Sequence, residues 1–343
     1  MKRIRFFIFA TLLMLLPALP GFTQNGQGVE GRAGANRAFI TNFGGDGISV
    51  IDLESRRLIT HIKTGSLPHG VAIAPDGKAV YVSNEGDGTL SFIDPLRNAV
   101  TATIPVGRKP NQLEVSADGK YVFVTLNGDD GLAVVEAATR KVLKTVPVGR
   151  APHIALRSPD GKVIYVTLEG DMKVVAVDAA SFAIIGNIPV LAFPRVPALT
   201  PDGKRLYQTI RWLNGALVID AAKNRVVDRI ALCEPKYADE GKDAHGLAVT
   251  PDGKQLWLST QTTDDVTILD TRDHKILGRV TVGRDPNWIG LTADGKLAVV
   301  SNTGSNDVSL IDVSQQKEIT RIKVGAAPKR LAVGRVFIEQ ATR

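Results

Sequence analysis

A repeated Asp-Gly dipeptide constrains the fold of this chain more than any other feature. The pairs recur at intervals of 42, 42, 42, 50 and 42 residues. They stand at 76–77, 118–119, 160–161, 202–203, 252–253 and 294–295. Their context recurs as well, as in VAIAPDGKAVYVSN (71–84) and LAVTPDGKQLWLST (247–260). A fixed period of this length indicates repeated structural units rather than two unrelated domains.

A second recurrent run, which ends in an acidic residue, shows that there are seven units. Its copies are ISVID (48–52), LSFID (90–94), LAVVE (132–136), VVAVD (174–178), ALVID (216–220), VTILD (266–270) and VSLID (308–312). Each unit offers four short runs rich in β-branched residues, separated by turn residues and without helical periodicity. Four strands in a unit of this length are typical of a β-propeller blade.

The order of the runs predicts how the ring closes. The chain enters on the second strand of a unit, AFITN (38–42), and leaves after an innermost strand, KRLAV (329–333). We expect these two strands to pair, because pairing leaves no open edge. The predicted fold is an all-β, seven-bladed β-propeller of four-stranded antiparallel blades over residues 37–333, closed by the C-terminal strand. Residues 25–36 are then a linker and residues 334–343 a C-terminal tail.

The N-terminus predicts export to the periplasm or secretion. Lys2, Arg3 and Arg5 precede the apolar run FFIFATLLMLL (6–16), which is too short to span a bilayer. This pattern is that of a signal peptide, assigned to residues 1–24. Its removal takes away three positive charges and lowers the formal net charge from +7 to +4. We therefore expect a mildly basic monomer with no nucleic-acid partner and no membrane span after signal removal.

One polar position recurs at the end of the connection that leads into each innermost strand. It lies seven residues before the Asp of each Asp-Gly pair, at one mouth of the predicted central channel. Its occupants are His69, Asn111, His153, Arg195, His245, Asn287 and, in the seventh unit, Lys329. Such a ring can simply hold channel water, or it can form a concave ligand site. The sequence leaves both interpretations open.

One unit departs from the pattern on this side of the ring. Its connection is CEPKYADEGKDAH (233–245), where other units use five residues, as in GSLPH (65–69). The same unit has RWLNG (211–215) in place of the usual turn. An insertion beside the channel mouth can form one wall of a pocket or a lid. The residues expected to gather in this sector are Arg195, Arg211, Trp212 and Cys233.

Three of the strand runs carry a resemblance to a known family. The runs VYVSN (80–84), VFVTL (122–126) and IYVTL (164–168), each after an Asp-Gly-Lys turn, resemble those of YVTN-family seven-bladed β-propellers. The resemblance covers about residues 37–333. Secreted bacterial members of this family include a group associated with PQQ-dependent alcohol catabolism. The seven repeats and the signal peptide of this chain are similar to those of that group. The resemblance implies a binding or interaction protein accessory to such an oxidation system. Its partner would be a periplasmic protein or a small molecule at the channel mouth, and the chain itself would bind no PQQ.

Two other functions remain open. In a propeller enzyme of the lactonase or lyase type, His153 or His245 would be the base and Arg195 would stabilise an oxyanion. In a metal or redox-cofactor protein, His69, His153 and His245, which stand on alternate units, would bind copper or zinc, with Cys233 as a fourth ligand. The motifs G-x-S-x-G, H-E-x-x-H and C-x-x-C-H do not occur in the sequence, which disfavours elbow-type serine hydrolysis, zincin chemistry and covalent haem.

Overall fold

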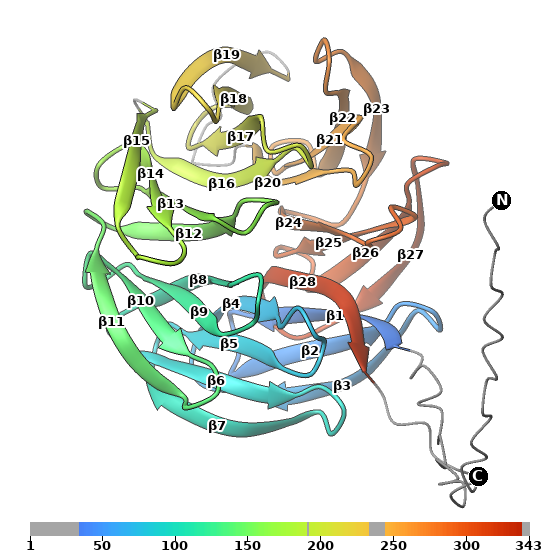
Figure 1. Ribbon diagram of the computed structural model, residues 1–343. Helices are drawn as coiled ribbons and strands as arrows, with labels where there is room; N and C mark the ends of the chain where they lie inside the picture. Colours follow the sequence, from blue (N-terminus) through green and yellow to red (C-terminus); the bar gives the residue numbers. More distant parts are fainter. Residues whose placement is uncertain (1–33, 191, 233–243, 338–343) are drawn as a thin grey trace, which may run out of the picture. The chain divides into compact units, whose positions relative to one another are not determined.

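The computed structural model describes residues 34–190, 192–232 and 244–337. These residues form 28 β-strands in seven four-stranded antiparallel sheets, arranged as the blades of a ring (Figure 1). The predicted seven-bladed propeller is confirmed. No helix in these three ranges is long and apolar enough to cross a membrane. The predicted signal peptide, Cys233 and most of the long insertion lie outside the described residues.

Each blade runs from an innermost strand at the central channel to an outermost strand at the rim. The innermost strands are β28 (Pro328–Phe337), β4 (Pro68–Ile73), β8 (Pro110–Val115), β12 (Pro152–Arg157), β16 (Pro194–Leu199), β20 (Ala244–Val249) and β24 (Pro286–Leu291). The second strands are β1 (Gly34–Asn42), β5 (Val80–Asn84), β9 (Tyr121–Leu126), β13 (Val163–Leu168), β17 (Arg205–Ile210), β21 (Gln255–Thr260) and β25 (Leu297–Asn302).

The remaining two strands of each blade lie farther from the channel. The third strands are β2 (Gly47–Asp52), β6 (Thr89–Asp94), β10 (Gly131–Glu136), β14 (Lys173–Asp178), β18 (Gly215–Asp220), β22 (Asp265–Asp270) and β26 (Asp307–Asp312). The outermost are β3 (Arg57–Lys63), β7 (Ala99–Pro105), β11 (Lys141–Pro147), β15 (Ile184–Pro189), β19 (Arg225–Ala231), β23 (Ile276–Thr281) and β27 (Lys317–Lys323). Blade 1 is β28-β1-β2-β3, and blades 2 to 7 follow in chain order.

The ring closes through the pairing of β28 with β1, as predicted. Phe39 pairs with Ala332 and Ile40 with Leu331 in an antiparallel register. The two strands are longer than expected, because pairing continues to Gly34 opposite Phe337. The end of the segment predicted as linker and the start of the predicted tail are therefore strand.

The Asp-Gly pairs form the tight turns between innermost and second strands. The glycines have φ of +67° to +74°, a left-handed conformation that side chains with a Cβ rarely adopt. In the turn after β8, the Asp118 carboxylate accepts hydrogen bonds from the Ser116 hydroxyl (2.7 Å) and the Lys120 amide (3.1 Å). These repeated aspartates therefore hold turns.

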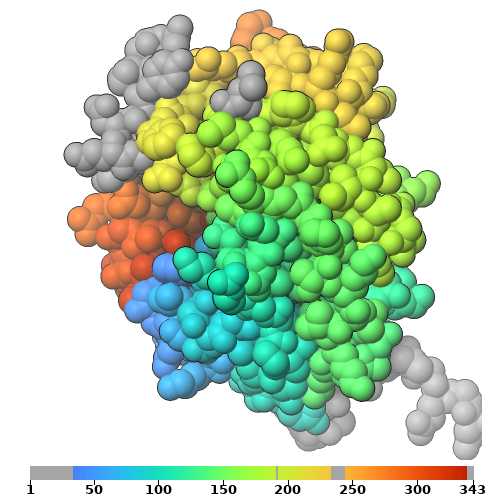
Figure 2. All heavy atoms as spheres, turned by 90° about the vertical axis from the view of Figure 1, so that its left-hand side faces the viewer, coloured from blue at the N-terminus to red at the C-terminus, as the bar shows by residue number. Residues whose placement is uncertain are grey.

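Apolar side chains from neighbouring blades meet to form the core. Tyr81 and Phe92 of blade 2 pack with Leu113 and Val124 of blade 3 in one buried cluster. A similar cluster joins blades 7 and 1 at the closure. Seen from the edge that carries β11, the blades lie side by side in chain order, from blue through green to yellow (Figure 2). Each blade therefore positions the next one around the channel.

Candidate functional site

Each second strand carries a fully buried Ser or Thr at the same repeat position, near the channel mouth. These seven side chains, the hydroxyl ring, are Thr41, Ser83, Thr125, Thr167, Thr209, Ser259 and Ser301. Thr41 Oγ1 accepts a hydrogen bond from the Arg330 amide of its own blade (3.0 Å) and donates to the His69 carbonyl of blade 2 (2.9 Å). Thr209 links the Val196 amide (3.0 Å) to the His245 carbonyl (2.8 Å) in the same way. The Ser or Thr of the VYVSN-type runs therefore fixes the backbone of the mouth.

The seven polar residues identified by counting back from Asp-Gly all occupy one structural position. Each is the second residue of an innermost strand. This set, the mouth ring, is His69, Asn111, His153, Arg195, His245, Asn287 and Lys329. The histidines and asparagines are buried, with 4–6% of each residue exposed, whereas Arg195 and Lys329 are half-buried. The rings of His69 and His153 lie 6.0 Å apart.

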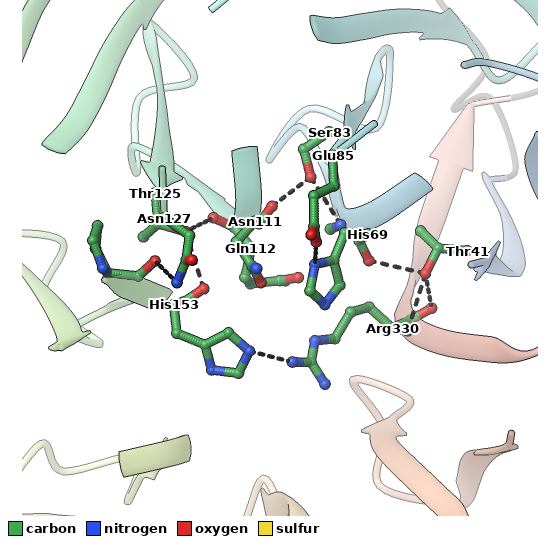
Figure 3. Close-up of polar contacts among 12 residues, drawn as sticks. Thr41, His69, Ser83, Glu85, Asn111, Gln112, Thr125, Asn127, His153 and Arg330 are labelled. Atoms are coloured by element: carbon green, nitrogen blue, oxygen red, sulfur yellow. Dashed lines mark hydrogen bonds and ion pairs between the residues drawn. The ribbon is translucent and has the colours of Figure 1, made fainter. Parts of the chain in front are cut away.

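Arg330 is a central residue of the site that the sequence argument missed. Its guanidinium reaches from blade 1 to the opposite side, as Figure 3 shows, where Nη2 donates to His153 Nε2 (2.9 Å). Nη1 donates to Asn287 Oδ1 (3.0 Å), and the group stacks on Trp288 at 4.5 Å. The residue is 1% exposed. One signal was available, since Arg330 is the only charged residue at this repeat position, where other units have Gly, Gln, Ile, Val or Trp.

Hydrogen bonds define the protonation of the three buried imidazoles. His153 accepts at Nε2 from Arg330, so its proton is on Nδ1. His245 Nδ1 lies 2.9 Å from the Asn287 carbonyl and donates to it, and His69 Nδ1 lies 2.7 Å from the Glu85 carboxylate. Burial lowers the pKa of His69 to about 3 and places the pKa of His153 and His245 well below 6.5, with the charge of Arg330 acting in the same direction. All three are neutral at pH 7.

Two carboxylates that were not predicted complete the mouth. Glu85 and Glu169 each follow a second strand, at the same repeat position in blades 2 and 4. Glu85 pairs with His69, and Glu169 lies 3.2 Å from Arg195 Nη1 and 3.4 Å from His153 Nδ1. Burial alone would raise the pKa of Glu85, but the hydrogen bond with His69 and the nearby lysines bring it below 4.5. Glu85 therefore orients His69 through a hydrogen bond, and Glu169 pairs with Arg195 beside His153.

The geometry does not support the predicted metal site. Among the residues that the structure describes, no group of three His, Cys, Asp or Glu side chains is arranged to hold a metal ion. The Arg330 guanidinium donates to His153 Nε2, the nitrogen that would bind the metal. A cation of the protein's own therefore lies among His69, His153 and His245. Cys233, the proposed fourth ligand, lies outside the described residues.

Arg211 and Trp212 lie apart from the mouth ring. Trp212 is 41% exposed, with the Arg211 guanidinium 4.9 Å above its ring and Phe193 packed edge-on at 5.5 Å. Both line a largely apolar hollow of about 510 Å³, together with Val190, Ile210 and Leu213. No mouth-ring residue lines this hollow. Arg211 and Trp212 therefore line a different hollow from the mouth ring, which contains Arg195.

Another hollow, of about 720 Å³, lies on the Asp-Gly side and is lined by Asp252, Asp294 and Lys296 among others. Its carboxylates are engaged in their own turns. Asp252 accepts from the Thr250 hydroxyl (2.6 Å), and Asp294 accepts from the Thr292 hydroxyl (2.6 Å). Turn formation therefore accounts for both aspartates without a ligand, so we place the candidate site at the mouth ring.

Fold and site together define a seven-bladed β-propeller with a buried, polar channel mouth. The YNCE-like beta-propeller family model matches residues 7–187, and the chain belongs to this family. No curated protein sequence matches the chain.

Several solved structures share the fold. Hydrazine synthase of Kuenenia stuttgartiensis is 24% identical, with a TM-score of 0.74 over 85% of this chain and 99% of that chain. Dihydro-heme d1 dehydrogenase NirN is 18% identical, with a TM-score of 0.62 over 92% and 77%. A Bacteroides fragilis protein proposed to be a 6-phosphogluconolactonase is 17% identical, with a TM-score of 0.72 over 87% and 98%. At these identities the likeness concerns the fold alone.

Proposed function

We propose that this chain is a non-catalytic binding or interaction protein of the periplasm or the secreted fraction, and that its ligand or partner docks at the mouth ring. We further propose that it serves a PQQ-dependent alcohol oxidation system without binding PQQ itself. One observation carries the binding role. Polar atoms at the mouth, among them His69 Nε2, Asn111 Oδ1 and Arg330 Nε, are buried without a hydrogen-bond partner in the described residues. Buried polar groups normally have partners, and a ligand that enters the mouth would supply them.

The protonation of the site favours binding over proton-transfer catalysis. A general base works best when its pKa lies near the operating pH, whereas burial lowers the pKa of His153 and His245 well below 6.5. Arg195, the proposed oxyanion stabiliser, is paired with Glu169. A lactonase or lyase is therefore the alternative proposal, supported by fold likeness only.

The link to alcohol oxidation is supported by the VYVSN-type runs and by the seven repeats. Export is supported by the pattern of residues 1–24. We propose a monomer, because each blade finds both of its neighbours within one closed ring.

A binding measurement with a defined partner tests the proposal. The purified protein is immobilised, and a PQQ-dependent alcohol dehydrogenase from the same organism is passed over it. We expect saturable binding that Arg195→Ala weakens at least about tenfold, the effect of losing one contact worth about 1.4 kcal/mol. Lys144→Ala, on the exposed face of the distant strand β11, is the control. A wild-type protein that does not bind the dehydrogenase contradicts the accessory role. Lactone hydrolysis abolished by His153→Asn would favour the enzyme instead.

A further inference from the structure

Three cationic side chains from distant parts of the sequence converge at the channel mouth. Lys329 and Arg330 come from β28, and Arg195 comes from β16 in blade 5. The Lys329 ammonium lies 3.4 Å from the centre of the Phe43 ring. The pKa of Lys329 is lowered to about 8, chiefly by burial and then by repulsion from Arg330 and Arg195, which Glu85 and Glu169 partly oppose. The three charges are therefore close enough to act on one another.

The carboxylates at the mouth do not balance these charges. Glu85 pairs with neutral His69, and Glu169 pairs with Arg195. Among the described residues of the mouth, three buried or half-buried cations then face two carboxylates, since the imidazoles are neutral, and exposed Lys109 adds positive charge near Glu85. Positive charge is therefore in excess at a mostly buried site. An uncompensated charge removed from water is unfavourable unless an opposite charge joins it.

The unused hydrogen-bond donors of the same three side chains indicate which kind of ligand would balance their positive charge. Nε of Arg195 and Nε of Arg330 are buried and have no hydrogen-bond partner in the described part of the chain. The Lys329 ammonium contacts Phe43, and no hydrogen bond from it to a described residue is formed. These groups only donate, so the missing partner is an acceptor. Half-buried Phe43 and Trp288 beside them offer apolar surface to an organic group.

We propose that the channel mouth is a carboxylate-binding site, in which Lys329 and Arg195 engage the carboxylate above the buried Arg330. This inference rests on the proposed function and names the chemistry of its ligand. The excess of positive charge favours an anion, and Glu85 and Glu169 repel a phosphate dianion more strongly than a monoanion. The carboxylate can belong to a small molecule or to the C-terminus of a partner protein. The chemistry is the same in both cases.

The test uses paired probes that differ only in the carboxylate. Calorimetric titration compares benzoate with benzamide, and a tripeptide with a free C-terminus with its C-terminal amide; inorganic phosphate is a separate arm. We expect at least one carboxylate to bind and its amide partner to fail. Arg195→Gln and Lys329→Gln should each weaken binding about tenfold or more, because each removes a charge-assisted hydrogen bond. Lys144→Gln removes the same charge from exposed β11 and should leave affinity unchanged.

Each outcome decides the inference. Binding of benzoate assigns a small-molecule carboxylate, and binding of the peptide acid alone assigns a partner's C-terminus. Amides that bind as well as acids, phosphate that binds more tightly than both carboxylates, or an equal loss in Lys144→Gln would overturn it. Melting curves of the variants exclude misfolding. If all carboxylates fail while Arg195→Ala still weakens binding of the dehydrogenase, this inference is wrong and the proposed function stands.

Discussion

Acid should destabilise this propeller through the three buried histidines of the mouth ring. In the unfolded chain a histidine takes up a proton when the pH falls below its ordinary pKa of 6.5. In the folded protein, burial holds the pKa of His69 at about 3 and the pKa values of His153 and His245 well below 6.5. The unfolded state therefore binds more protons, and stability falls as pH is lowered through 6.5. Between pH 7 and pH 5, each histidine should lower the free energy of unfolding by about 2 kcal/mol. Three such groups give about 6 kcal/mol, a large share of the 5–15 kcal/mol typical of a folded domain.

The repeat supplies its own matched substitution. Asn111 and Asn287 occupy the mouth-ring position in two blades, so His→Asn replaces one natural occupant by another. His245→Asn is the best choice, because His245 donates to a backbone carbonyl rather than to a carboxylate. Urea unfolding at pH 7 and pH 5 should show a pH-dependent loss smaller by about 2 kcal/mol than in the wild type.

The control is His61→Asn on the exposed outermost strand β3, which makes the same chemical change outside the channel. A pH-dependent loss that is identical in the wild type and in His245→Asn would refute the argument that burial keeps His245 neutral. It would show that the imidazole accepts its proton without unfolding.

Three further predictions concern the ring closure, Arg330 and Lys329. Truncation after Val324 removes β28 and exposes Phe39 and Ile40, which are 0% exposed. Exposing each side chain costs about 1.5–3 kcal/mol of stability, and the hydrogen bonds between β1 and β28 are lost as well. Circular dichroism should therefore show a lower melting temperature, and an unchanged melting temperature would contradict the closure. Arg330→Ala removes the cation that bonds His153 Nε2, but no three His, Cys, Asp or Glu side chains of the described residues are placed to hold a metal ion. A variant that stays folded should therefore take up no more Zn²⁺ than the wild type in a dye-competition titration, and greater uptake would show that the imidazoles meet at a metal once Arg330 is gone. The pKa of Lys329 is lowered to about 8 from 10.5, so binding of an anion that restores the charge of Lys329 should be accompanied by proton uptake at pH 8.5. Calorimetry of carboxylate binding in two buffers of different ionisation enthalpy measures this proton uptake, and Lys329→Gln should abolish it.

The repeat predicts backbone position much better than side-chain contacts. Counting back from Asp-Gly predicted seven equivalent residues at the end of the connection into each innermost strand. The structure places each of them inside that strand, as its second residue, and hydroxyls such as Thr41 hold that position in register. The same count could not show that the long side chain of Arg330 crosses the channel to His153. That contact depends on the radius of the ring, which follows from packing between blades.

The irregular unit was harder to interpret for the same reason. Arg211 and Trp212 were expected beside Arg195, because they interrupt the repeat on the same side of the ring. Trp212 instead takes a positive φ of 66° and packs on Phe193, beside a separate apolar hollow. The conformation of a non-repeated loop follows from local contacts that the other six units do not reveal.

The hydroxyl ring has a consequence for how such a protein can diversify. At the mouth its hydrogen bonds join hydroxyl groups to main-chain amides and carbonyls, as Thr209 does with Val196 and His245. The side chains of the mouth ring take no part in these bonds. Mutation can therefore exchange the chemistry of one position without changing the geometry of the others. The mouth offers seven positions whose backbone is held without help from their side chains, and ligand preference can evolve through combinations of those side chains while the scaffold stays the same.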